Sequence, residues 1–382
     1  MHVLLRAHDI LLRLTGRDDL IESILTLLAA ATAVWFVGAY YLRGKDLSAF
    51  DAPESEARQR FSVGDHLNDE HRAVIATLAG INQALKGVPR AERLARLRTH
   101  MDNLFASQPL AARFIPVDAG GVPAEWVIAP GADSARRTLY LHGGAYIFGS
   151  PRSHRVITSR LSEISGGAVL AIDYRLMPEY PRMAGIEDSR CAYRWMLEYG
   201  PDGAGHADVV YVAGDSAGGN LGLSLIAWVR DQGLRAPNAV VALSPATDSS
   251  LSGPSIMKNL ATDAMLGPLF KPLLQMPRSL LLWSVRIRNR MKPGNPLISP
   301  IFGDLSNLPP LLVQASEVEM LLDDSLRYVN KAVAAGTQAR LQTWNHVVHV
   351  WHLFDPALTE ARQAFEEIRK FLAEHSKGEP AA

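Results

Sequence analysis

The sequence predicts a large α/β domain in which helices cover both faces of a mostly parallel sheet. Short β-type runs alternate with helical stretches from residue 113 to residue 344, a pattern typical of a doubly wound fold. Several runs are almost wholly apolar, for example AVLAID at 168–173 and AVVALS at 239–244. Strands of a parallel sheet have this continuous apolar character because both of their faces are buried.

Each element is placed by its local pattern. Two stretches with apolar residues at helical spacing, 71–86 and 90–106, are expected to form helices ahead of the sheet. Residues 46–65 are polar and are interpreted as a linker, and the folded domain is expected to cover 66–376. The sheet is expected to contain eight strands, at residues 113–118, 124–129, 137–141, 168–173, 208–213, 238–243, 310–315 and 339–344.

Composition excludes several classes of protein. Hydrophobic residues make up 48% of the 382 residues, which is enough for a full core and excludes a mainly disordered chain. Lys plus Arg and Asp plus Glu both number 39, so no basic excess supports general nucleic-acid binding. The single cysteine, Cys191, excludes an intramolecular disulfide and a cysteine-rich zinc site.

An uncharged run of twenty residues, Ser23 to Leu42, lies near the N-terminus. As a helix it would be about 30 Å long, which matches the hydrocarbon core of a bilayer. Aromatic residues near its end, including Tyr40 and Tyr41, precede Arg43, as expected where a helix leaves a membrane. We therefore interpret residues 1–45 as a membrane-associated helical segment. A buried helix and a signal peptide cleaved after Ala33 are the alternatives.

The strongest chemical motif is Gly-Asp-Ser-Ala-Gly at 214–218. It lies between an apolar strand and a sequence of good helix formers, which is the setting of a nucleophile elbow with Ser216 as the nucleophile. A second glycine-rich turn, His-Gly-Gly-Ala at 142–145, follows an earlier strand. Backbone N–H groups in such a turn are available to a ligand, and in an acyl-transfer enzyme they would stabilise an oxyanion.

Together these motifs resemble the hormone-sensitive-lipase-like branch of the α/β-hydrolases, a group of serine carboxylesterases and lipases. The resemblance covers about residues 140–375, and it implies an α/β-hydrolase fold with an eight-stranded sheet and a helical cap formed by 66–110 and 246–298. Six segments carry it in the family's order: LHGGAYIFGSPRSHR, DYRLMPEYP, GDSAGGNL, LSPATDSSLSGPS, LPPLLVQASEVEMLLDDS and WNHVVHVWHLF.

The resemblance implies a catalytic triad of Ser216, Glu319 and His349. The family's acid is usually the first Asp of Asp-Pro-Leu-x-Asp, and here that stretch reads Glu-Met-Leu-Leu-Asp from residue 319 to residue 323. Glu319 is therefore the expected acid, and Asp323 is the alternative, because either carboxylate can orient a histidine. His349 aligns with the general base.

The resemblance also implies an oxyanion hole formed by Gly143, Gly144, Ala145 and Ala217. The expected donors are the N–H groups of Gly144, Ala145 and Ala217, while Gly143 shapes the turn. Ala145 replaces the family's third glycine, which is tolerable if its φ is negative. His142 is expected to brace the loop rather than to act as a second base.

Two further motifs are set aside. His346, His349 and His352 are spaced too widely around a helix to hold one metal ion, and no carboxylate motif accompanies them. Ser255 begins an S-x-x-K sequence, but no K-T-G motif follows it. We expect no metal and no cofactor.

The predicted function is that of a serine carboxylesterase or lipase acting on lipophilic esters. The alternatives are a non-catalytic small-molecule receptor of the same fold, and an amidase or peptidase. Expected partners are the ester or lipid substrate and a membrane, reached through residues 23–42 and the basic cap segment 278–292, without nucleic acid; a homodimer is left open. The balance of Lys and Arg around the apolar run leans toward a cytoplasmic catalytic domain.

Overall fold

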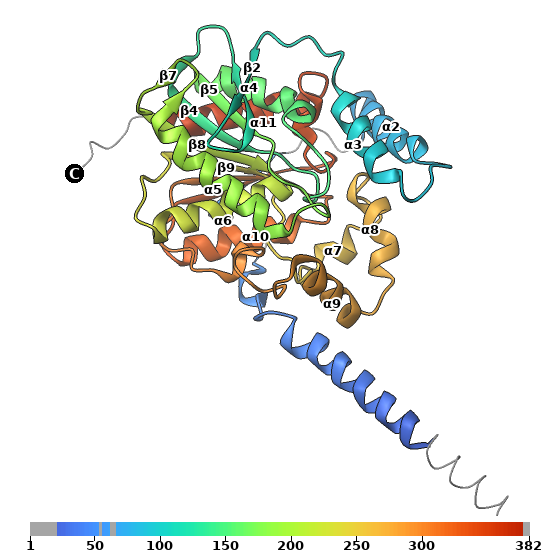
Figure 1. The fold of residues 1–382 in the computed structure, drawn as a ribbon. Coiled ribbons are helices and arrows are strands. Elements are labelled where there is room, and N and C mark those ends of the chain that lie inside the picture. Colours follow the sequence, from blue (N-terminus) through green and yellow to red (C-terminus); the bar gives the residue numbers. More distant parts are fainter. Residues whose placement is uncertain (1–20, 53–55, 62–65, 377–382) are drawn as a thin grey trace, which may run out of the picture.

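The central feature of the computed structural model is a nine-stranded sheet, and the structure describes residues 21–52, 56–61 and 66–376 (Figure 1). The strand order is β1-β11-β10-β9-β8-β4-β5-β3-β2, and β3 alone runs in the direction opposite to the other strands. The strands are β1 (Arg58–Phe61), β2 (Arg113–Asp118), β3 (Pro123–Ile128), β4 (Asp133–Leu141), β5 (Gly167–Ile172), β8 (Val209–Asp215), β9 (Ala239–Leu243), β10 (Leu311–Ser316) and β11 (Ala339–Trp344). A small ribbon pairs β6 (Tyr199–Gly200) with β7 (Gly203–Ala204).

All eight expected strands are present, and the count of eight is wrong by one. Strand β1 comes from the segment expected to be a linker, and it pairs in parallel with β11 at the edge of the sheet. Its sequence, Arg-Gln-Arg-Phe, lacks an apolar pattern because an edge strand is half solvated. Tertiary contacts secure it: Phe61 stacks on Trp344 with ring centroids 4.4 Å apart, and Arg58 forms an ion pair with Glu317 at 2.6 Å.

Helices cover both faces of the sheet and form two apolar cores. One core contains side chains of α5 (Arg182–Glu198), α6 (Ala217–Asp231) and α10 (Leu322–Ala334). The other contains side chains of α4 (Arg155–Ser165) and α11 (Thr359–Glu374). Short 3₁₀ turns complete the body: η2 (Ser48–Phe50), η3 (Arg152–His154), η4 (Pro300–Phe302) and η5 (Trp351–Phe354).

The remaining helices gather at one side of the sheet, where the expected cap lies (Figure 1). They are α2 (Asp69–Ala84), α3 (Arg93–Leu104), α7 (Ser255–Lys258), α8 (Leu266–Leu274) and α9 (Arg278–Asn289). The first two correspond to the expected helices 71–86 and 90–106: α2 is shifted by two residues toward the N-terminus, and α3 is shorter at both ends. The assignment of these helices to a cap remains a prediction.

An apolar helix, Ile21–Tyr41, projects from the body beyond α9 (Figure 1). Its mean hydropathy is 1.8 and only 6% of its apolar window is buried, so it is not a core helix. Its length and composition fit a membrane span or a signal sequence. Its last turn is a π-helix, η1 (Val37–Tyr41), and the chain then enters the body, where Leu42 and Leu47 are buried.

Candidate active site

Ser216 lies on a sharp turn between β8 and α6. Its φ is 51°, a left-handed value that a residue with a side chain adopts only under strain. The flanking glycines are required by space: a Cβ on Gly218 would lie 1.9 Å from the Leu141 carbonyl oxygen, and one on Gly214 would lie 2.6 Å from the Gly218 oxygen. The turn therefore presents the Ser216 hydroxyl at the carboxyl end of the sheet, beside the N-terminus of α6.

His349 lies opposite Ser216, on the loop that follows β11. Its Nε2 is 2.9 Å from the Ser216 Oγ and can accept the hydroxyl proton. Neighbouring serines hold the loop: the Ser316 hydroxyl donates to the Val347 carbonyl at 2.6 Å, and the Val350 N–H donates to the Ser244 hydroxyl at 3.3 Å. The imidazole is buried, so its position is set by packing as well as by hydrogen bonds.

The carboxylate that contacts His349 belongs to Glu319, just after β10. The His349 Nδ1–H donates to the Glu319 Oε2 at 2.7 Å, and the Ser316 N–H donates to the Glu319 Oε1 at 3.1 Å. Asp323, the alternative acid, instead accepts the Ser255 N–H at 2.5 Å, while its own N–H donates to the Ser255 hydroxyl at 3.0 Å. The structure thus brings Ser216, His349 and Glu319 into one chain of hydrogen bonds and leaves Asp323 outside it.

The protonation of the pair follows from burial and charge. Burial raises the pKa of Glu319, against the effect of the His349 hydrogen bond. Burial also opposes a charged imidazole, but the hydrogen bond and charge of Glu319 outweigh it and raise the pKa of His349. The imidazolium that would form on proton transfer from Ser216 is therefore stabilised.

The glycine-rich loop adopts a left-handed path beside this chain of hydrogen bonds. Gly144 has a φ of 113° and Ala145 has a φ of 52°, so the condition of a negative φ at Ala145 is not met. The reason is a tight turn, in which the N–H groups of both Ile147 and Phe148 donate to the Gly144 carbonyl at 3.0 Å. A left-handed alanine costs about 1–2 kcal/mol, which the surrounding fold offsets.

Asp215, which precedes Ser216, holds the glycine-rich loop in place. The sequence motifs gave this residue no role. Its Oδ1 accepts the Gly143 N–H at 2.9 Å and the Tyr140 hydroxyl at 2.5 Å, and its Oδ2 lies 3.3 Å from the His154 Nε2. The Gly143 N–H is therefore engaged within the protein, consistent with a shaping role. A signal was present, because a charged residue at the end of a seven-residue buried strand needs buried partners.

The other histidines near the site are structural. Burial lowers the pKa of His142 to about 3, and its Nδ1–H donates to the Gly143 carbonyl at 2.7 Å. His352 is buried against Gln314, with its Nε2 2.8 Å from the amide oxygen, and the ring of His346 lies near that of His71. Among the residues that the structure describes, no group of three potential ligands is placed to hold a metal ion.

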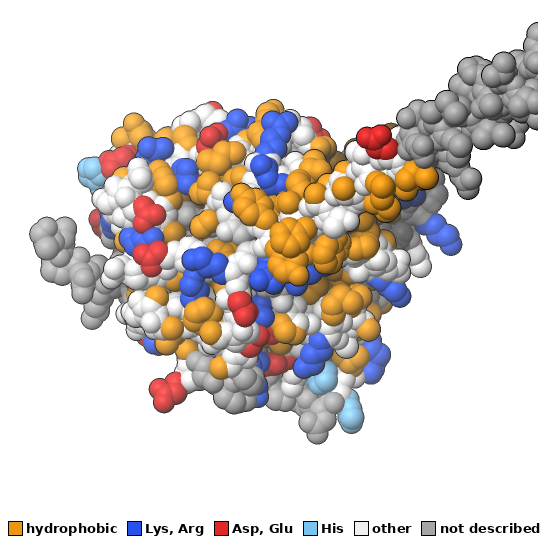
Figure 2. Space-filling view, turned by 90° about the horizontal axis from the view of Figure 1, so that it is seen from below, with side chains coloured by type: hydrophobic (Ala, Val, Ile, Leu, Met, Phe, Trp, Pro, Cys, Tyr) orange, Lys and Arg blue, Asp and Glu red, His pale blue; other side chains and the backbone are white. Residues whose placement is uncertain are grey.

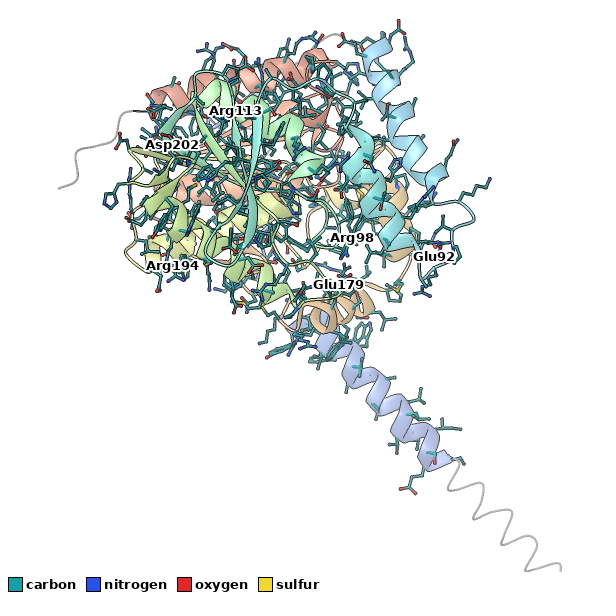
Figure 3. All side chains as sticks on the ribbon, turned by 45° about the horizontal axis from the view of Figure 1, so that its top comes forward. Glu92, Arg98, Arg113, Glu179, Arg194 and Asp202 are labelled. Atoms are coloured by element: carbon teal, nitrogen blue, oxygen red, sulfur yellow. The ribbon has the colours of Figure 1, made fainter. Side chains whose placement is uncertain are left out.

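Arg98 on α3 connects the expected cap to the glycine-rich loop, a contact that the sequence did not suggest. Its guanidinium donates to the Ile147 carbonyl at 2.8 Å and to the Met177 carbonyl at 3.1 Å. It also pairs with both carboxylate oxygens of Glu179, at 2.8 and 2.9 Å, and Figure 3 shows the two labelled residues side by side. This fork holds the loop against α3.

Comparisons with known proteins show the family of this chain. Residues 138–353 match the α/β-hydrolase fold family. An acetyl-hydrolase from Streptomyces hygroscopicus is 40% identical over 257 residues, which cover 67% of this chain and 81% of that protein. The chain belongs to the α/β-hydrolase family.

Solved structures place the hydrolase in the hormone-sensitive-lipase-like branch. The crystal structure of an esterase from the bacterial hormone-sensitive lipase family is similar with a TM-score of 0.70 and 35% identity, covering 81% of the hydrolase and 99% of that chain. The carboxylesterase/phospholipase LipF from Mycobacterium tuberculosis is 34% identical over 256 residues, covering 65% of the hydrolase and 66% of LipF. The hydrolase is a carboxylic ester hydrolase of this branch.

Proposed function

We propose that the hydrolase is a membrane-anchored serine esterase that cleaves lipophilic esters through Ser216, His349 and Glu319. The observation that carries the triad is the pair of hydrogen bonds at His349, one to the Ser216 hydroxyl at 2.9 Å and one to Glu319 at 2.7 Å. Acyl transfer by a serine requires that the nucleophile contact a base and that an acid orient this base.

In the acylation step the Ser216 oxygen attacks the ester carbonyl while His349 Nε2 takes the hydroxyl proton. The carbonyl oxygen becomes an oxyanion, for which the N–H groups of Gly144, Ala145 and Ala217 are the proposed donors; one such donor contributes about 10²–10³ in rate. When the carbon–oxygen bond of the ester breaks, His349 returns its proton to the departing alcohol. Ser216 is left as an acyl ester.

In the deacylation step water replaces the alcohol. His349 takes a proton from the water as its oxygen attacks the acyl carbon, and it returns that proton to Ser216 Oγ when the carboxylic acid leaves. Glu319 remains ionised in both steps and stabilises the imidazolium. The residues supply the nucleophile, the proton transfers and the charge stabilisation of the reaction.

The preference for lipophilic esters rests on the exposed apolar helix and on the name of LipF, which is a phospholipase as well as a carboxylesterase. A span of 21 residues holds the active site near the bilayer, where esters with long chains concentrate. The slight excess of Lys and Arg after the apolar run supports a cytoplasmic catalytic domain.

A series of nitrophenyl esters of increasing acyl length tests the substrate class. We expect kcat/KM to rise with acyl length for the full chain in vesicles. A chain shortened to begin at Leu42 should show a flatter series, because it lacks the proposed anchor. A preference of the full chain in vesicles for acetate over all longer esters would contradict the proposal.

A further inference from the structure

The apolar helix does not leave the body freely but packs on α9 of the expected cap. The Trp283 indole N–H donates to the Val34 carbonyl at 2.9 Å. Gly38 allows close approach, since a Cβ there would lie 2.9 Å from the Ser279 Cβ. The end of the apolar helix and α9 therefore form one surface, and Figure 2 shows hydrophobic side chains gathered there with Lys and Arg beside them.

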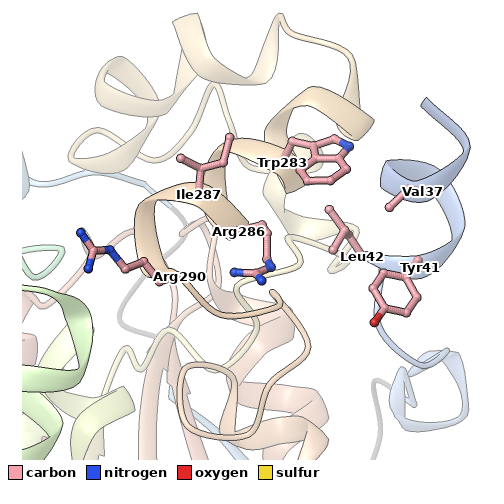
Figure 4. Close-up of a pocket in the computed structure, with 7 residues that line it drawn as sticks. All are labelled: Val37, Tyr41, Leu42, Trp283, Arg286, Ile287 and Arg290. Carbon is pink, nitrogen blue, oxygen red and sulfur yellow. The ribbon is translucent and has the colours of Figure 1, made fainter. Parts of the chain in front are cut away.

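Two adjoining hollows lie on this surface. The first, of about 360 Å³, is lined by Val37, Tyr41, Leu42, Trp283, Arg286, Ile287 and Arg290 (Figure 4). The second, of about 550 Å³, shares Val37 and Tyr41 and is lined otherwise by Phe36 and Tyr40. Cationic side chains line the first hollow, whereas apolar and aromatic side chains line the second. The pair therefore matches a lipid, which has a charged headgroup and an apolar acyl chain.

Two cations lie close to Tyr41, which lines the first hollow: Arg286, which also lines it, and Lys292, which lies beside it on the Tyr41 ring. Arg286 lies on the side of α9 that faces Leu42 and Tyr41 (Figure 4), and the Lys292 ammonium is 3.7 Å from the centroid of the Tyr41 ring. The side chain of Arg290 points away from the apolar helix. No Asp or Glu occurs in the sequence between Asp263 and Asp304, so α9 brings no counter-charge to these cations.

The positions of the two hollows along the apolar helix also suit a headgroup in the first and an acyl chain in the second. If the apolar helix spans a bilayer, its last turn, with Tyr40 and Tyr41, lies at the level of the headgroups. Arg286 and Lys292 are then at the height of lipid phosphates. The second hollow continues along the helix toward the hydrocarbon, beside Phe36, which is 57% exposed.

We infer that these two hollows bind one anionic phospholipid, with the phosphate between Arg286 and Lys292 and an acyl chain against Phe36 and Val37. A zwitterionic choline lipid is disfavoured because its ammonium would meet the same cations. The bound lipid would join the apolar helix to α9 and so set the orientation of the body on the membrane. This inference rests on the membrane attachment proposed above.

Fluorescence quenching of the full chain in vesicles tests it. All vesicles contain phosphatidylcholine with the same minority of phosphatidylglycerol, and only the lipid that carries bromine on its acyl chains differs, so the surface charge is constant. The fluorescence of Trp283 is obtained by subtracting the fluorescence of the Trp283→Phe variant from that of the native chain. We expect brominated phosphatidylglycerol to occupy the site with on the order of tenfold preference, since each cation near a membrane surface contributes several-fold.

The variant Arg286→Gln/Lys292→Gln should abolish that preference. The matched control is Arg113→Gln/Arg194→Gln, which removes two exposed cations that lie away from the apolar helix (Figure 3) and should keep it. Hydrolysis of a short soluble ester by each variant checks that it is folded. Quenching of Trp283 by each brominated lipid in proportion to its mole fraction in the bilayer would overturn the inference, as would loss of the preference in the control variant alone.

Trp35 separates this inference from the attachment on which it rests. It is 53% exposed on the apolar helix, and its signal is the difference between the native chain and Trp35→Phe. Quenching of Trp35 by both lipids with no preference at Trp283 would leave the attachment standing and remove the lipid site. Absence of Trp35 quenching by either lipid would remove both. Cross-linking of two chains through Trp283 and its neighbours would assign the hollows to a second copy and also overturn the inference.

Discussion

Backbone hydrogen bonds hold the turn at Ser216, so the hydroxyl that the reaction needs is not needed for the fold. The Ser216 N–H donates to the Leu243 carbonyl at 2.8 Å, and the Ser216 carbonyl accepts from Asn220 and Ala246. We therefore expect Ser216→Ala to fold normally, with an unchanged melting temperature, and to lose kcat by a factor of about 10⁶. Substantial turnover by the purified variant, with contaminating esterase excluded, would show that another residue is the nucleophile.

Glu319 and Asp323 differ in what they contact, and this difference predicts unequal effects. Glu319→Gln keeps an oxygen for the Ser316 N–H but removes the negative charge beside His349. It should lower kcat by about 10⁴, as when the acid of a triad becomes an amide. Asp323→Asn is the matched control and should retain most activity, because Asp323 binds the Ser255 turn. The reverse order of effects would make Asp323 the acid.

The raised pKa of His349 predicts the pH dependence of the reaction. His349 accepts a proton only when it is neutral, so kcat/KM should rise as the imidazole loses its proton. Because the Glu319 carboxylate raises the pKa of His349, the midpoint of this rise should lie above about 6.5, the ordinary value for histidine. In the residual activity of Glu319→Gln the midpoint should move to lower pH, since burial alone lowers the pKa of an imidazole. A midpoint unmoved in that variant would show that another group titrates.

At the scale of elements, β1 and the residues before it belong to the body. Leu47 is 4% exposed within the main core, and Arg327 forms an ion pair with Asp51, with 3.0 Å between its Nη2 and the Asp51 Oδ2. Strand β1 also covers the edge of β11. The boundary of the membrane-associated segment expected at residue 45 therefore leaves Leu42, which is also buried, outside the folded body.

Two truncated chains test this. A chain beginning at Leu42 should be soluble and should hydrolyse short esters at near-native kcat. A chain beginning at His66 lacks β1 and Leu47; it should lose several kcal/mol of stability and aggregate, because the edge of β11 is left open. Thermal unfolding and light scattering measure both effects. Equal melting temperatures would mean that β1 contributes nothing to the fold.

For the whole molecule, the property to test is whether the apolar helix spans a membrane, as proposed. A spanning helix is not released when electrostatic contacts are disrupted, so carbonate washing should leave the full chain in the membrane pellet. The chain beginning at Leu42 should appear in the supernatant after the same wash. Release of the full chain by carbonate would make the helix peripheral, and a mature chain lacking residues up to Ala33 would make it a signal sequence.

Much of the architecture could be read from local patterns. Continuous apolar runs predicted the inner strands correctly, because a strand that is buried on both faces has apolar side chains at nearly every position. Strand β1 could not be predicted in this way. Its residues Arg-Gln-Arg-Phe carry no strand period, and its pairing depends on Trp344 and Glu317, more than 250 residues away.

Part of the candidate site could likewise be predicted from local sequence, and part of it could not. A Ser between two spaced glycines, after a strand and before a helix, is a local signal, since only glycine fits at Gly214 and Gly218. The choice between Glu319 and Asp323 as the partner of His349 was not local: both follow β10, and only the folded loop shows that Glu319 faces the imidazole. The contact between Arg98 and the glycine-rich loop, and that between the apolar helix and α9, join segments distant in sequence. Composition and periodicity describe how each segment buries its own side chains, whereas which segments then meet depends on the closure of the whole chain.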